Sequence, residues 1–172
     1  MSKIQISKID AAKRQLDTAI NLFFNDADPV SIHTLTSAAY DILVSLAKSQ
    51  GIPGIIKNSS MIKKEHEKEY LDIINKPQNF FKHSGKDPKK TLEFSPKSTT
   101  FVLWDAVRIY MELTDEKPSN MIVYRNWFFL EHPNYLNDNW KIIYETQRTI
   151  TNPSDKAKFL EIIHLLDDIK YK

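Results

Sequence analysis

The 172-residue chain contains no cysteine and only three glycines. Without cysteine there are no disulfides, thiolate nucleophiles or cysteine-ligated zinc sites. Glycine usually makes up roughly 7% of a chain, so about a dozen would be typical at this length. Phosphate-binding loops and nucleophile elbows need glycines at fixed, close spacing, which Gly51, Gly54 and Gly85 do not supply. Such sites are excluded, and a fold rich in tight hairpins is disfavoured because their turns favour glycine.

Long apolar runs are also missing. Charged residues make up 27% of the chain, and its first eight residues lack the apolar segment of a signal peptide. We therefore expect a soluble, cytoplasmic protein with no membrane partner. The length suits one domain, and 41% hydrophobic residues with 19 aromatics are typical of a folded core.

Apolar residues recur at helical spacing through most of the sequence, and no alternating pattern lasts long enough to indicate a sheet. Ser7 and Asp28-Pro29 are typical helix starts, and Pro77 is expected to interrupt or restart a helix. The stretch around Trp140 is less regular. We predict an all-α, single-domain bundle of about six mostly antiparallel helices with an irregular loop at about 84–97. The expected helices begin near residues 8, 29, 61, 101, 119 and 153.

Charge is distributed unevenly along the chain. The net charge is only +2, but residues 57–90 hold nine lysines against five acidic residues. Such a strip can attract phosphate groups. Because Lys and Glu alternate within it, a solvated helix face explains the same pattern.

Arg125 and His132 are seven residues apart, which places them on one face of a helix two turns apart. An arginine that stabilises phosphorane charge and a histidine that moves protons would suit RNA cleavage. The alternative is structural, because Pro133 disfavours helical geometry at His132 and would place it at a helix C-terminus.

A second cluster follows at residues 79–88, where a histidine and charged residues stand beside two phenylalanines. This segment could bind a phosphate or a base through lysines and a stacking ring. In the alternative interpretation the phenylalanines anchor the loop and the Asp-Pro pair forms a turn. The candidate ligand-binding residues here are Phe80, Phe81, Lys82, His83, Lys86 and Asp87.

His33 and Tyr40 share one side of the helix expected at 29–51, and His33 could meet His83 or His132 inside the bundle. A satisfied core histidine is the alternative. Glu161-x-x-His164 is one half of a di-iron motif, which requires two such motifs, and His66 lies among charged residues. We predict neither a metal site nor a cofactor.

Three segments carry a family resemblance: Asp28–Leu35, Asn79–His83 with Asp87-Pro88, and Trp127–Pro133. They look like an uncharacterised family of bacterial helical proteins, which implies no activity. More loosely, Arg125-Asn126 followed by His132 resembles the HEPN superfamily of helical, often dimeric proteins. That resemblance implies a ribonuclease with Arg125 and His132 as its catalytic pair and Asn126 as a polar helper, or a non-catalytic member that binds nucleotides or partners.

Two functions remain open. One is a non-catalytic module that binds RNA, a nucleotide, another ligand or a protein partner, a second copy of the chain included. The other is a metal-independent ribonuclease. The module would use Phe80, Phe81, Trp127 and the basic strip, whereas the nuclease would use a cleft lined by His33, His83, Arg125 and His132.

Overall fold

A computed structural model describes residues 3–58, 63–83, 85 and 88–170, and within them the chain forms seven α-helices and no strand. The prediction of an all-α bundle is confirmed, with seven helices rather than about six. Two short 3₁₀ turns, η1 (Lys48–Gln50) and η3 (Pro133–Tyr135), follow the second and fifth helices. The helices are α1 (Lys8–Phe24), α2 (Pro29–Ala47), α3 (Lys64–Lys82), α4 (Lys97–Thr114), α5 (Ser119–Glu131), α6 (Asp138–Arg148) and α7 (Lys156–Lys170).

Two details of the predicted helices are corrected. The stretch around Trp140 is regular and forms α6, whose N-cap Asn137 accepts a hydrogen bond from the Trp140 backbone N–H. Pro77 lies inside α3 and does not interrupt it. Directly after this proline, the buried Gln78 donates to Asp41 of α2 at 2.6 Å, which ties the last turns of α3 to the bundle. In the irregular loop the described residues 88–96 are not helical.

The expected caps explain where the first two helices begin and end. Ser7 and Asp10 form a reciprocal capping box at the start of α1. The Asp28 side chain accepts from the Ser31 N–H, and Pro29 occupies the first turn of α2. After α2 the helix tightens into the 3₁₀ turn η1. This turn ends at Gly51, whose φ of 71° is in the left-handed region that favours glycine.

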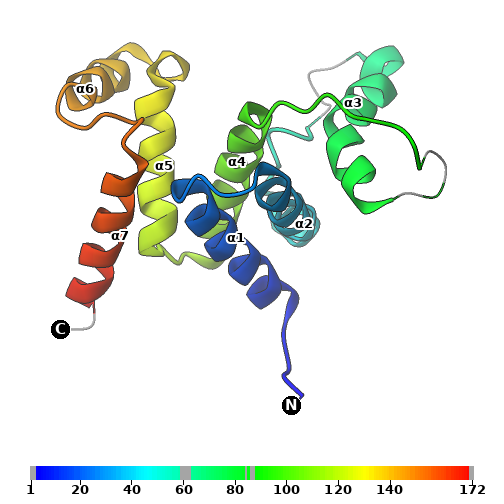
Figure 1. Cartoon of the computed structure of the whole chain (residues 1–172), viewed down its shortest axis with the longest axis horizontal. Helices are drawn as coiled ribbons and strands as arrows, with labels where there is room; N and C mark the ends of the chain where they lie inside the picture. Colours follow the sequence, from blue (N-terminus) through cyan, green and yellow to red (C-terminus); the bar gives the residue numbers. More distant parts are fainter. Residues whose placement is uncertain (1–2, 59–62, 84, 86–87, 171–172) are drawn as a thin grey trace.

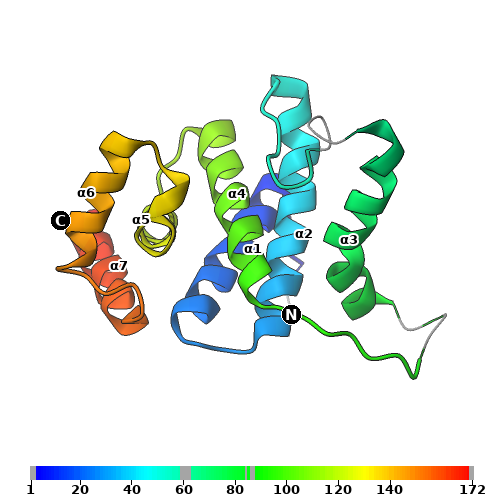
Figure 2. The ribbon, with the colours of Figure 1, turned by 90° about the horizontal axis from the view of Figure 1, so that it is seen from above.

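The helices lie side by side along the long axis of the molecule, in an order that differs from the chain order: α3, α2, then α1 and α4, then α5, then α6 and α7 (Figures 1 and 2). α3 lies at one end and packs against α2, which in turn packs against α1 and α4. α5 contacts both α1 and α4, and it carries α6 and α7 at the other end. The central helices α1, α2, α4 and α5 therefore surround most of the core, while α3 and α6 are peripheral.

Large aromatic side chains fill this core. Tyr40, Tyr110 and Tyr124 are almost completely buried. Phe23 and Phe24 at the end of α1 pack against Tyr124 and Trp127 of α5, with ring centroids 4.5–6.3 Å apart. Phe159 of α7 stacks on Phe24 at 5.6 Å. The C-terminal end of α1 is thus the point at which α1, α5 and α7 converge.

Among the described residues, one helical stretch, Pro29–Gln50, is long and apolar enough to cross a membrane by length and composition alone, and 44% of its apolar 18-residue window is buried inside the bundle. Its apolar residues include Ile32, Ala39 and Leu43, which belong to the core between α1 and α4. Packing within the bundle accounts for this apolarity.

Candidate functional site

His33 occupies a closed cluster between α2, α3 and α4. Its Nδ1 lies 2.9 Å from the Thr99 hydroxyl, and its Nε2 lies 3.2 Å from the Ser37 hydroxyl. The rings of Phe81 and Phe94 meet the imidazole edge-on at 5.7 and 5.1 Å. Burial lowers the pKa of His33 to about 4, and the charge of Lys57 acts in the same direction. The imidazole is therefore neutral near pH 7, with both ring nitrogens occupied.

The other predicted ligand residues do not all gather around His33. Phe81 packs against it, and Phe80 packs against Phe81 but is itself about one-third exposed. Lys82 and His83 are exposed at the end of α3. Lys86 and Asp87 lie outside the described residues.

Tyr40 takes part in a different buried network, centred on Asp105 of α4. The Tyr40 hydroxyl donates to Asp105 Oδ2 at 2.7 Å, and the backbone N–H groups of Ile55 and Ile56 donate to the same oxygen at 2.6 and 3.0 Å. Arg108 binds Asp105 Oδ1 through two nitrogens at 2.8 and 2.9 Å. Burial and the hydrogen bond to Asp105 raise the pKa of Tyr40. This network fixes the 51–57 segment against the bundle.

Arg125 and His132 are held by different neighbours. Arg125 is exposed, and its charge acts on Tyr144 of α6, whose hydroxyl donates to Asn126 at 3.0 Å. His132 ends α5, and its ring packs against Phe101 and Phe128 at 4.9 and 4.7 Å. Burial lowers the pKa of His132, opposed by Glu131 and assisted by Arg148. No described contact joins the Arg125 guanidinium to the His132 ring.

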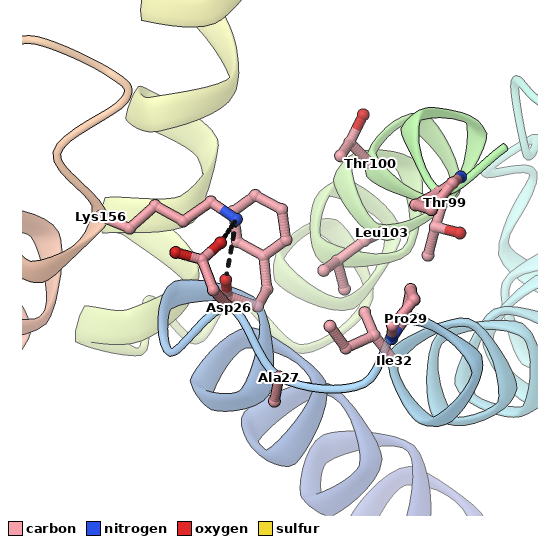
Figure 3. A pocket seen from close by; sticks show the side chains of 10 residues that line it. Asp26, Ala27, Pro29, Ile32, Thr99, Thr100, Leu103 and Lys156 are labelled. Atoms are coloured by element: carbon pink, nitrogen blue, oxygen red, sulfur yellow. Dashed lines mark hydrogen bonds and ion pairs between the residues drawn. The ribbon is translucent and has the colours of Figure 1, made fainter.

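A pocket of about 250 Å³ opens where α1 turns into α2, and we call it the corner pocket (Figure 3). Its polar lining consists of Thr99 and Thr100 from the first turn of α4, and of Asp26 and Lys156. Most of the wall is carbon. The apolar lining residues are Phe23, Ala27, Pro29, Ile32, Pro96 and Leu103.

An ion pair occupies one side of the corner pocket. Lys156, the first residue of α7, donates from Nζ to Asp26 Oδ1 at 2.6 Å and to the Phe23 carbonyl oxygen at 3.1 Å. The ammonium also lies 4.0 Å from the centre of the Phe23 ring. Figure 3 shows it across the cavity from Pro29 and Ile32.

The backbone turn at Asp26 and a hydrogen bond of Trp127 position the walls of the pocket. Asp26 has a φ of 49°, a left-handed conformation that aspartate tolerates better than most residues, and this sharp turn brings α2 back beside α1. Trp127 is buried, and its indole N–H donates to the Pro153 carbonyl at 2.9 Å, which fixes the segment that leads to Lys156. Trp127 therefore has a structural role in the core of the bundle.

Comparison of the chain with protein-family models, with curated proteins and with solved structures finds no match. The HEPN resemblance and the RNA, nucleotide, protein-partner and homodimer hypotheses stay predictions. The corner pocket was missed by sequence reasoning. Asp26 and Lys156 are 130 residues apart, and only the packing of α7 against α1 brings them together. The one local signal was the Asp28-Pro29 helix start, which marks the corner but not the cavity.

Proposed function

We propose that this chain is a non-catalytic binding module that holds a small, mainly apolar molecule in the corner pocket. The observation that carries the proposal is a cavity with a carbon wall and a single ion pair at one side. Filling such a cavity removes apolar surface of both ligand and protein from water, at about 25 cal/mol per Å². Ligand sites are typically built in this way, from an apolar wall with a few oriented polar groups.

The volume sets the size of the molecule. A dry apolar cavity of about 150 Å³ is large enough to bind benzene. The corner pocket, at about 250 Å³, suits one six-membered ring with a short substituent. A nucleotide is too large to be enclosed here, because drug-sized ligands occupy pockets of roughly 300–1,000 Å³.

The lining favours binding over catalysis. General acid–base catalysis needs a group that can exchange a proton with the ligand. The two ionisable lining residues, Asp26 and Lys156, are engaged with each other. His33 is not among the lining residues, and its two ring nitrogens lie beside the hydroxyl groups of Thr99 and Ser37.

Binding of benzene, observed by NMR chemical-shift changes, tests the proposal. We expect wild-type protein to show saturable changes at residues of the corner pocket. Ile32→Trp, which enlarges a side chain that Figure 3 shows pointing into the cavity, should abolish them, whereas Ile73→Trp, the same substitution at an exposed position of α3, should not. Equal binding by all three proteins, or no binding by wild type, would contradict the proposed function.

A second assay separates this function from the ribonuclease alternative. Labelled RNA is incubated with wild-type protein and with His132→Ala in the presence of a chelator. We expect no cleavage by either, because no described contact joins the Arg125 guanidinium to the His132 ring, which packs against Phe101 and Phe128. Cleavage that disappears with His132→Ala would support the ribonuclease instead.

A further inference from the structure

The polar groups of the corner pocket carry a balanced charge. Lys156 and Asp26 form one ion pair at 2.6 Å, and the other polar lining residues are the uncharged Thr99 and Thr100. An anionic ligand would bring a second carboxylate or phosphate beside Asp26, and a cationic ligand would bring a second positive charge beside Lys156. Either would place a charge without a counter-ion of its own against an apolar wall, where it loses hydration, whereas Asp26 itself stays hydrated with 75% of its side chain exposed.

The hydrogen-bonding groups of the lining restrict the class of ligand further. An ammonium has three N–H donors, and the described contacts of the Lys156 Nζ use two of them, for Asp26 and for the Phe23 carbonyl. The Thr100 hydroxyl donates to the Lys97 carbonyl, and the Thr99 hydroxyl is engaged with His33. The third Lys156 N–H, beside the Phe23 ring, can serve a ligand acceptor, and Lys156 is the only charged donor among the described lining residues.

We infer that the corner pocket selects an uncharged molecule of single-ring size that carries one hydrogen-bond acceptor, such as an alcohol or a carbonyl compound. The ring lies against the carbon wall formed by Ile32 and Leu103, and the oxygen accepts from Lys156. This inference rests on the proposed function, because it names the ligand class of the same site.

Four probes built on the same benzene ring test the ligand class: toluene, benzyl alcohol, benzoate and benzylammonium. Dissociation constants are measured by NMR titration at pH 7. Benzyl alcohol is expected to bind with a dissociation constant of roughly 0.1–1 mM, in keeping with so small a ligand. It should bind at least about tenfold more tightly than toluene, because its hydroxyl accepts a hydrogen bond from a charged group. Benzoate and benzylammonium should bind at least about tenfold more weakly than benzyl alcohol.

Lys156→Met tests the role of the ammonium, since methionine keeps the length and apolar stem of the side chain. It should abolish the preference for benzyl alcohol over toluene while toluene still binds. Lys158→Met is the matched control, because Lys158 is exposed two residues further along α7 and pairs with Glu161. This control should keep the preference. Thermal unfolding followed by circular dichroism verifies that both variants are folded.

The outcomes distinguish the two proposals. Toluene binding without any advantage for benzyl alcohol overturns the ligand class but leaves the pocket as a binding site. Tighter binding of benzoate or benzylammonium also overturns the class, in favour of an ionic ligand. If none of the four probes binds wild-type protein, the proposed function fails together with this inference.

Discussion

At the scale of single residues, His33 is a titratable side chain held in a buried environment. Only 4% of its surface is exposed, and two hydroxyls and two phenylalanine rings surround the imidazole. A charged imidazolium at this point would lose its hydration and would face the positive charge of Lys57. Folding therefore favours the neutral ring.

This environment makes stability depend on pH. The pKa of His33 is lowered from an ordinary 6.5 to about 4, so between these values the unfolded chain binds more protons than the folded one. The contribution of His33 to the free energy of unfolding is therefore fully present above about pH 6.5, and it is lost as the pH decreases toward 4. We expect His33 to account for a loss of about 2 kcal/mol between pH 7 and pH 5, measured by urea denaturation.

The comparison that isolates this effect is His33→Gln against His66→Gln. His66 is a solvent-exposed histidine on α3, so His66→Gln should retain the pH dependence of wild type. His33→Gln should lose most of it, whatever its absolute stability. An unchanged slope in His33→Gln would assign the effect to other groups.

At the scale of helices and their connections, Asp105 joins three pieces of the chain. Its carboxylate accepts from Tyr40 of α2, from the backbone of the 51–57 segment and from Arg108 of its own helix. Arg108 also donates to the Pro53 carbonyl at 2.6 Å, so the segment is held twice. A Cβ on Gly54 would lie 2.7 Å from the Tyr40 hydroxyl, and the segment can therefore approach this closely only with glycine there.

Asp105→Asn should destabilise the protein by about 3 kcal/mol, because the substitution removes the charge that pairs with Arg108 and turns an NH₂ group toward existing donors. Glu112→Gln is the control, since Glu112 also binds Arg108 at 2.8 Å but is about half exposed. It should cost less than about 1 kcal/mol. Urea denaturation measures the free energy of unfolding of both variants. Similar losses in the two variants would show that the burial of Asp105 does not determine the cost of the substitution.

Local signals identified most elements, but not the contacts between them. Ser7, Asp28-Pro29 and Gly51 mark helix ends through their own side-chain and backbone chemistry, so they were recognisable in the sequence. The helix α6 was missed although Trp140, Ile143 and Tyr144 recur at helical spacing, because the helix is only 11 residues long and mostly polar. Asp105 drew no attention because its partners come from residues 40, 55 and 56.

At the scale of the whole molecule, burial decreases from the centre toward both ends. The helices α1, α2, α4 and α5 each contribute at least six buried residues, whereas α3 contributes Gln78 and α6 contributes none. The His33 cluster ties α3 to the centre, and Tyr144 ties α6 to α5 through a ring contact with Phe129 at 5.5 Å. The corner pocket lies in the well-packed part, between α1, α2 and α4 and beside the start of α7 (Figure 3).

Native-state hydrogen exchange should reproduce this gradient. Local opening requires less free energy where few apolar groups are buried, so amides in α3 and α6 should exchange at least about tenfold faster than the slowest amides of α2 and α4. The experiment is run at two protein concentrations, because α6 exposes Trp140, Ile142 and Ile143. Exchange in α6 as slow as in α2 at both concentrations would contradict the gradient. Slow exchange at the higher concentration alone would show that a second copy covers α6, and the gradient would then hold only for the single chain.

If the centre is the slowest region as expected, the walls of the corner pocket are fixed before a ligand arrives, and binding requires little rearrangement of the bundle.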